Sequence, residues 1–344
     1  MLEHMFYPVT TMPLDQQLFE LRRVRPDTPE FRGIEFIEAE AKTIINHVPG
    51  GALPFSWTIN PYRGCTHACV YCFARTTHTF MDMNAGRDFE SKIVVKVNAP
   101  EVLRAQLGSK RWKGELIAMG TATDPYQRAE GRYRLMPRII RTLADYRNPF
   151  SILTKGTMIL RDLDLLIEAA GVTEVSTAFS IGTLDEDAWR RTEPGTPHPR
   201  KRIEAVAALN RVGIPCGVLV APVLPGITDH PRQLREVVAA AIDAGATHVS
   251  PIMLHRRPGV KEEFMPWLRR EFPDLVERYE QMYRKPYGPS SERKELARRV
   301  SSIARALGGL GPDPAGPSSR FSRRRGDREE DDRVPEEPRQ LTIV

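Results

Sequence analysis

The chain has 344 residues, of which 41% are hydrophobic and 27% are charged, and its formal net charge is +6. These values are ordinary for a globular protein and exclude a fibre, and the charge is well below that of a strongly basic nucleic-acid binder. The longest apolar stretch, residues 217–227, is broken by Pro222 and Pro225 and is too short to span a bilayer. Because the N-terminus also lacks a secretory signal pattern, we expect a cytoplasmic protein with no membrane partner.

In chain order, the first 55 residues are predicted to be an irregular appendage with one strand at 33–48. From Trp57 onward, short β-rich runs alternate with amphipathic helical runs, which is typical of parallel strands joined by crossover helices. The expected strands are 57–60, 116–119, 150–153, 174–179, 214–221 and 248–254, with an extra strand at 93–97. This repeat predicts an α/β fold with a partial or complete parallel barrel, and an open doubly wound sheet is the alternative.

Apolar stripes mark the predicted helices between these strands. One stripe comprises Leu163, Leu166, Ile167 and Ala170, and the other comprises Leu234, Val237, Val238, Ala241 and Ile242, with Thr228 or Asp229 as its N-cap. No Gly-x-Gly-x-x-Gly follows a predicted strand, which argues against a dinucleotide site.

The C-terminal region is predicted to contain one helix and a tail. Apolar residues at helical spacing over 290–307, followed by Gly308 and Gly309, indicate a terminal helix. From residue 311 on, the chain is rich in charge, Pro and Ser, so we expect disorder. We therefore divide the chain into an N-terminal appendage (1–55), a barrel (56–289), a C-terminal helix (290–310) and a charged tail (311–344).

Three of the four cysteines lie close together. Cys65, Cys69 and Cys72 form a C-x3-C-x2-C spacing after the first predicted barrel strand, whereas Cys216 lies far downstream. This is not a disulfide framework, and clustered thiols favour metal binding. Three thiolates can hold three irons of a cubane and leave the fourth iron open, whereas electron-transfer clusters usually have four protein ligands. A zinc site that adds His67 or Cys216 is the alternative.

The C-x3-C-x-aromatic-C sequence, with Tyr71 in the aromatic position, resembles the hallmark of the radical SAM superfamily. The resemblance implies a partial parallel (β/α)6 barrel and a 4Fe-4S cluster on Cys65, Cys69 and Cys72, whose open iron binds S-adenosylmethionine. It also implies that Tyr71 lies near the adenine. Reductive cleavage of the cofactor would give methionine and a 5′-deoxyadenosyl radical, with a reductant such as flavodoxin or ferredoxin as partner. A barrel mouth suits this radical because it excludes water.

Residues 32–268 resemble the spore photoproduct lyase-related branch, often described as DNA-repair-photolyase-like, and most closely its uncharacterised bacterial members. The resemblance is carried by EAKTIINHVPG, FESKIVVKVNAP, MGTATDPYQ, ILTKG, STAFSIGTLDEDAWRRTEPGTP and VLVAPVLPGITD. It implies that Thr121, Thr123 and Asp124 lie near the methionine amino group. By the same resemblance, Lys155 contacts the methionine carboxylate and Ser180 lies near the ribose and carboxylate. The alternatives are an Asp-Pro turn at Asp124 and a solvated strand end at Lys155.

One departure from the lyase concerns the hydrogen donor. The lyase has a donor cysteine at a place that corresponds to Thr121, and a hydroxyl is a far poorer hydrogen-atom donor than a thiol. The resemblance therefore implies the radical-generating half of the reaction and leaves the second half open. Tyr126 and Cys216 are candidates for a relay or donor, with packing as the alternative. His67 and His78 lie near the cysteine loop without an assigned role.

Charge and family branch together predict the substrate class. Arginine-rich runs at 190–202 and 256–261 and the basic terminal helix favour a nucleic acid, so the enzyme hypothesis is radical chemistry on a nucleic-acid base. Solvated, ion-paired faces are the alternative, since Glu193, Glu262 and Glu263 partly neutralise these runs. The second function hypothesis is a noncatalytic nucleic-acid-binding protein that a metal or cluster stabilises. We expect a monomer.

Overall fold

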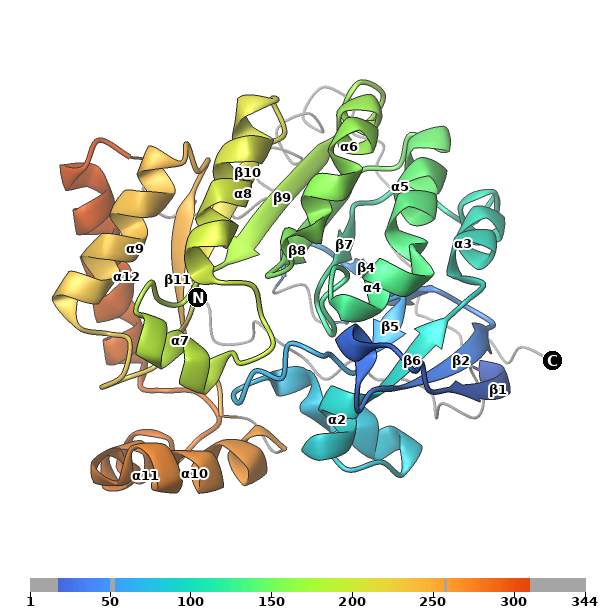
Figure 1. Cartoon of the computed structure of the whole chain (residues 1–344). Coiled ribbons are helices and arrows are strands. Elements are labelled where there is room, and N and C mark those ends of the chain that lie inside the picture. The colour runs from blue at the N-terminus through green and yellow to red at the C-terminus, as the bar shows by residue number, and fades with distance from the viewer. Residues whose placement is uncertain (1–17, 50–52, 257–258, 310–344) are drawn as a thin grey trace, which may run out of the picture.

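The computed structural model describes residues 18–49, 53–256 and 259–309, and Figure 1 labels the helices and strands. The predicted tail at 311–344 and the beginning of the predicted appendage, residues 1–17, lie outside the described residues. Within the described residues, no helix combines the length and the apolar character that a membrane crossing requires.

The larger sheet has seven strands in the order β11-β10-β9-β8-β7-β4-β3. All neighbours from β4 to β11 pair in parallel, whereas β3 (Ile45–His47) runs antiparallel to β4. The order follows the chain without reversal, so the doubly wound alternative is wrong and the partial parallel barrel is confirmed. The parallel strands are β4 (Trp57–Ile59), β7 (Ile117–Met119), β8 (Phe150–Thr154), β9 (Val175–Ser180), β10 (Cys216–Val223) and β11 (Val249–Met253).

Crossover helices, α5, α6, α8 and α9 among them, cover the outer face of this sheet (Figure 1). The long helices are α3 (Ala99–Leu107), α5 (Leu135–Asp145), α6 (Leu163–Ala170), α8 (Pro199–Arg211), α9 (Pro231–Asp243), α10 (Val260–Glu271) and α12 (Ser290–Ala306). Further helical segments are η1 (Pro29–Phe31), η2 (Phe73–Met81), α2 (Arg87–Ser91), α4 (Arg128–Tyr133), η3 (Thr157–Asp162), α7 (Glu186–Thr192), η4 (Pro273–Leu275) and α11 (Val276–Met282).

A second sheet, in the order β1-β2-β6-β5, lies beside the barrel (Figure 1). Its strands are β1 (Leu18–Val24), β2 (Glu35–Ala41), β5 (Tyr62–Arg63) and β6 (Lys92–Lys96). The single strand predicted at 33–48 is therefore wrong, because β2 and β3 belong to different sheets. The chain turns between them, where the Gln106 side chain accepts hydrogen bonds from the backbone N–H groups of Ile44 and Ile45.

The predicted helices are present, with corrections to their details. In α9, Leu234, Val237, Val238 and Ala241 are buried as expected. The N-cap is His230, whose ring Nδ1 accepts from Arg232 N at 3.3 Å, because the Thr228 and Asp229 side chains instead cap the preceding turn. In α6 the buried face contains Leu166 and Ala169, whereas Ile167 is 41% exposed.

The terminal helix α12 is part of the main hydrophobic core. Its Leu296, Val300 and Ala304 are buried in the same cluster as strand residues of the barrel. The helix ends at the glycine pair, as expected: Gly308 has a φ of +74°, and Gly309 N donates to Ala304 O at 2.9 Å. The basic residues of this segment therefore lie on a helix whose apolar face is covered by the barrel.

Candidate active site

The cysteine loop follows β4 and β5, at the carboxyl edge of the parallel sheet. Cys65 and Cys69 are buried, Cys72 is partly buried, and all three are free thiols. Gly64 enters the loop at a φ of +78°, and a Cβ at this position would lie 2.8 Å from Phe89 O, so the position requires glycine. The loop thus brings three thiols to the end of the barrel where parallel-barrel enzymes place their active sites.

Two side chains from the segment after β7 hold the backbone of the cysteine loop. Thr123 Oγ1 and Gln127 Nε2 both donate to Gly64 O, at 2.8 and 2.9 Å, and Gln127 Oε1 accepts from Thr66 N at 2.9 Å. Both side chains are buried. From the sequence, Thr123 is predicted to lie near the cofactor. In the structure, its hydroxyl group donates its hydrogen to the backbone of the cysteine loop and so positions that loop. Gln127 was not predicted, because its role depends on a contact between distant segments.

Arg75, on η2 just after the loop, is a second anchor. Its side chain is 2% exposed, and Nε and Nη2 donate to Cys69 O at 3.2 and 3.0 Å. Nη1 donates to Ala85 O and Gly86 O, and Nη2 pairs with Glu90. A guanidinium has enough donors to serve all of these acceptors at once. The backbone of the middle cysteine is therefore fixed by a buried cation.

The donor set fits an iron–sulfur cluster. Burial, the Asp124 carboxylate and the other two thiols raise the pKa of Cys65 well above its usual value, and burial and Glu193 raise the pKa of Cys69 to about 12. Positive irons offset the cost of such thiolates. Among the described residues, no three His, Cys, Asp or Glu side chains surround a single metal-ion position. A cubane places each thiolate on a different iron, so its ligands need not converge on one point.

Asp124 connects the ends of β7 and β8 to the cysteine loop. Its Oδ1 accepts from Tyr126 N at 2.9 Å and from Thr154 Oγ1 at 2.6 Å. Its Oδ2 accepts from Lys155 N at 2.6 Å and lies 3.4 Å from His67 Nδ1. Burial by itself raises the pKa of Asp124, but His67 and these hydrogen bonds outweigh burial and lower the pKa below its usual value. The carboxylate therefore does more than form a local Asp-Pro turn.

Lys155 extends from the end of β8 across the mouth of the barrel. Its Nζ donates to Ser180 Oγ at 2.5 Å and to Ala221 O at 3.4 Å, so it reaches the ends of β9 and β10. The same atom lies 3.3 Å from Glu193 Oε1 and 5.8 Å from the centroid of the Tyr71 ring. The lysine side chain is only 13% exposed. The structure thus brings Tyr71, Lys155 and Ser180 together, and the solvated strand end is wrong for Lys155.

Glu193 and Arg202 complete the site, although the sequence placed both in an arginine-rich surface run. Arg202 is fully buried, pairs with Glu193 Oε2 at 2.5 Å and donates to Ser180 O at 3.0 Å. Tyr71 donates its hydroxyl hydrogen to Glu193 Oε1. Burial raises the pKa of Glu193, but Arg202, Lys155 and Tyr71 outweigh burial and lower that pKa to about 2. Sequence reasoning missed this pair because spacing does not show that a charged residue is buried.

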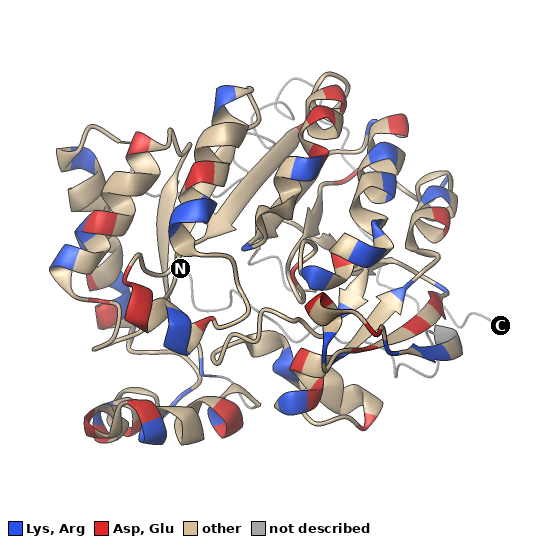
Figure 2. Cartoon of the chain, in the orientation of Figure 1, with Lys and Arg blue, Asp and Glu red and all other residues tan. Residues whose placement is uncertain are grey.

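The other basic residues of the two runs are also largely paired. Arg256 is 7% exposed and donates to Tyr283 O. On the surface, Arg190 and Lys201 form ion pairs with Glu186 and Glu204. Figure 2 shows blue and red segments interspersed along the outer helices. The described parts of these runs therefore offer less unpaired positive charge than the sequence predicted.

The remaining candidates lie in separate environments. Cys216 is buried and is the first residue of β10. At a rise of about 3.3 Å per residue, the strand extends roughly 23 Å from Cys216 to its carboxyl end. This placement excludes Cys216 as a fourth ligand beside the other thiols. His78 bonds Lys92 O through Nε2 at 2.9 Å, and Tyr126 is 1% exposed. Thr121 Oγ1 contacts the Asn60 side-chain amide.

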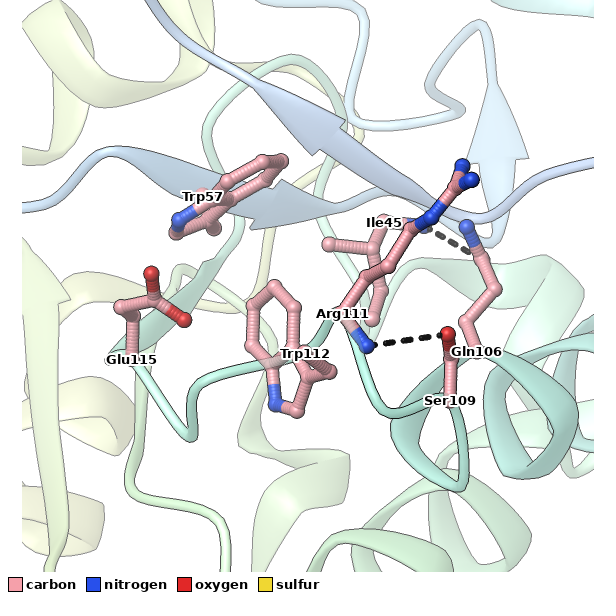
Figure 3. Close-up of a pocket in the computed structure, with 7 residues that line it drawn as sticks. All are labelled: Ile45, Trp57, Gln106, Ser109, Arg111, Trp112 and Glu115. Atoms are coloured by element: carbon pink, nitrogen blue, oxygen red, sulfur yellow. Dashed lines mark hydrogen bonds between the residues drawn. The ribbon is translucent and has the colours of Figure 1, made fainter.

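A cavity of about 240 Å³ lies at the opposite end of the barrel (Figure 3). Trp57, which starts β4, and Trp112 line it, and their rings meet edge to face at 5.2 Å. Glu115, which precedes β7, also lines the cavity. Because these residues flank the amino ends of the strands, the cavity is separate from the cysteine loop.

Residues 59–238 match the family model of the radical SAM superfamily, and the match contains the cysteine loop and the ends of β7, β8 and β9. This chain belongs to the radical SAM superfamily and is an enzyme of that class. The family implies a 4Fe-4S cluster and S-adenosylmethionine as cofactors.

Similar proteins include an uncharacterised protein of Mycobacterium tuberculosis H37Rv, 47% identical over 86% of this chain and 89% of that protein. A radical SAM Nα-GlyT isomerase of Pseudomonas phage M6 is 27% identical over 62% of this chain and 44% of the isomerase. A structure of spore photoproduct lyase complexed with dinucleoside spore photoproduct gives a TM-score of 0.61 at 15% identity, over 84% of this chain and 85% of the lyase. The structural likeness shows a shared fold.

Proposed function

We propose that this protein reductively cleaves S-adenosylmethionine at a 4Fe-4S cluster on Cys65, Cys69 and Cys72, and abstracts a hydrogen atom from its substrate. The observation that carries the proposal is the convergence of oppositely charged side chains beside the cysteine loop, with Asp124 after β7 and Lys155 after β8. When bound, the cluster supplies the electron that cleaves the sulfonium and yields the 5′-deoxyadenosyl radical.

The charges of the pocket favour an amino-acid ligand. Lys155 and Arg202 contribute two positive charges around the single carboxylate of Glu193, so this group has capacity for one further anion. We assign Lys155 and Ser180 to the methionine carboxylate. Asp124, whose carboxylate already accepts three hydrogen bonds and lies 3.4 Å from His67 Nδ1, is assigned to the methionine ammonium through its negative charge. Tyr71, whose hydroxyl group is held by Glu193, presents its ring to the adenine.

The decisive experiment is to incubate anaerobically reconstituted protein with S-adenosylmethionine and a reductant, and to measure 5′-deoxyadenosine together with metal content. We expect iron, sulfide and 5′-deoxyadenosine formation that depends on the reductant. Zinc in place of iron, with no 5′-deoxyadenosine, would contradict the proposal and favour the noncatalytic, metal-stabilised protein. Deuterium transfer between 5′-deoxyadenosine and candidate substrates would then identify the site of hydrogen abstraction.

Replacing Lys155 by methionine removes the proposed partner of the cofactor carboxylate and keeps the apolar length of the side chain. Loss of one partner of a buried charge pair costs about 2–5 kcal/mol, so we expect the dissociation constant of S-adenosylmethionine to rise by about thirty-fold or more. Equilibrium dialysis with reconstituted protein measures this change. Lys201→Met, on the exposed face of α8, is the matched control and should bind normally. If Lys155→Met binds S-adenosylmethionine as tightly as Lys201→Met does, the proposed role of Lys155 is refuted.

As substrate class we propose a nucleic-acid base. Support comes from the net charge of +6 and from the fold likeness to a lyase whose structure contains a dinucleoside. Because many surface arginines are already paired with carboxylates, we expect the protein to contact few nucleic-acid phosphates. The affinity for nucleic acid should therefore fall only gradually as the salt concentration rises. Binding of single- and double-stranded oligonucleotides, measured by fluorescence anisotropy over a salt series, tests this. Absence of binding at low salt would contradict a nucleic-acid substrate and leave the radical chemistry unaffected.

A further inference from the structure

We infer that Glu193 competes with the carboxylate of S-adenosylmethionine for Lys155, and that Arg202 holds Glu193 in place when Lys155 turns to the cofactor. The inference rests on the proposed function, because it takes Lys155 as the partner of the methionine carboxylate. The inference makes Glu193 a positioning residue that lowers the affinity of the site for S-adenosylmethionine.

The two oxygens of Glu193 have different partners. Oε1 accepts from the Tyr71 hydroxyl group and lies 3.3 Å from Lys155 Nζ. Oε2 lies 2.5 Å from Arg202 Nη2 and accepts from Thr196 Oγ1 at 3.3 Å. One oxygen therefore faces the cofactor residues and the other is held by a cation behind it. This arrangement allows Lys155 to leave without exposing an unpaired buried carboxylate.

Lys155 is the mobile cation of the pair and Arg202 is the fixed one. The Arg202 side chain is 1% exposed and donates to Ser180 O and Pro197 O, at 3.0 and 2.9 Å, in addition to its contact with Glu193. The Lys155 side chain is 13% exposed, and its contact with Glu193 is 0.8 Å longer than that of Arg202, from 3.3 and 2.5 Å. A lysine ammonium on a flexible stem can also change partners more readily than a planar guanidinium fixed by several acceptors.

The sign of the effect follows from electrostatics. Lys155 must leave the Glu193 carboxylate before it can pair with a ligand carboxylate, and breaking this buried ion pair lowers the affinity for the ligand. Replacing Glu193 by glutamine keeps its size and its acceptor for Tyr71 and removes the charge that holds Lys155. A residue with only a structural role would instead weaken ligand binding when it is replaced.

The test measures S-adenosylmethionine binding to the reconstituted full chain by equilibrium dialysis, without turnover. We expect Glu193→Gln to tighten binding by about ten-fold, and to have no such effect in a Lys155→Met background. Unchanged or weaker binding in folded Glu193→Gln would overturn the inference, and so would equal tightening in the Lys155→Met background. Lys155→Met with wild-type affinity would instead refute the role of Lys155 in the proposed function.

Folding controls keep the test decisive. Glu35→Gln alters another buried glutamate that pairs with arginines, Arg23 and Arg25, at the start of β2 in the second sheet, and should leave the affinity unchanged. If Glu193→Gln does not fold because Arg202 loses its buried partner, Glu193→Gln combined with Arg202→Met restores the charge balance. That double variant should also bind more tightly than wild type, and weaker binding in the folded double variant would overturn the inference.

Discussion

Replacing Cys65, Cys69 or Cys72 singly by alanine is expected to abolish both the cluster and the formation of 5′-deoxyadenosine. Each thiolate is assigned to a different iron, so no remaining ligand substitutes for a lost one. The loop backbone is held independently by Thr123, Gln127 and Arg75, so the fold should survive. Iron and sulfide content, visible absorbance and product formation measure the result, and thermal melting confirms folding.

Cys216→Ala is the matched control for these variants. Its thiol is buried, like those of Cys65 and Cys69, but it lies at the amino end of β10. We expect Cys216→Ala to keep its cluster and its cleavage activity, with a stability loss of about 1 kcal/mol. Full cluster content in any of the three loop variants, or cluster loss in Cys216→Ala, would require a different ligand set.

Gly195→Ala is expected to impair cluster assembly without changing any ligand. A Cβ at Gly195 would lie 2.1 Å from Thr66 O and 2.9 Å from His67 O, so either the backbone of the cysteine loop or the segment after α7 must move. Overpacking of this kind typically costs about 1–3 kcal/mol. We expect less than about half of the wild-type iron content after reconstitution, and a lower melting temperature, as measured by metal analysis and calorimetry.

Gly131→Ala distinguishes this local effect from a general effect of adding a methyl group. Gly131 lies within α4, and a Cβ there would meet only Met158 Sδ, at an ordinary 3.6 Å. Alanine at this helical position should be neutral or slightly stabilising and should leave iron content intact. Wild-type iron content in Gly195→Ala would show that the close packing of the two segments does not control cluster assembly.

The sequence predicted the barrel strands because buried parallel strands form continuous apolar runs. Residues 150–153 and 214–221 were located to within a few residues for that reason. The three cysteines were found from their spacing, whereas Lys155 and Ser180, which end predicted strands, were found from the resemblance to the lyase branch. Their assignment to a cluster and to the cofactor remains a prediction.

The rest of the site depends on tertiary contacts that a local pattern does not contain. Glu193 contacts Tyr71 across a separation of 122 residues, and Gln127 contacts Gly64 across 63. Arg202 was expected on a charged surface, because a buried arginine looks the same in sequence as an exposed one. The division of 33–48 into two strands was missed because a turn that is stabilised by the distant Gln106 has no signal of its own.

The order of the larger sheet has a consequence for the shape of an acceptable substrate. Within the described residues, the sheet ends on β11 and β3, which are not hydrogen-bonded to one another. A closed barrel admits only molecules that enter along its axis, whereas a sheet with two free edges also leaves a lateral approach to the ends of its strands. In the described part of the chain, the strand ends that carry Asp124, Lys155 and Ser180 are therefore not enclosed by a continuous ring of strands.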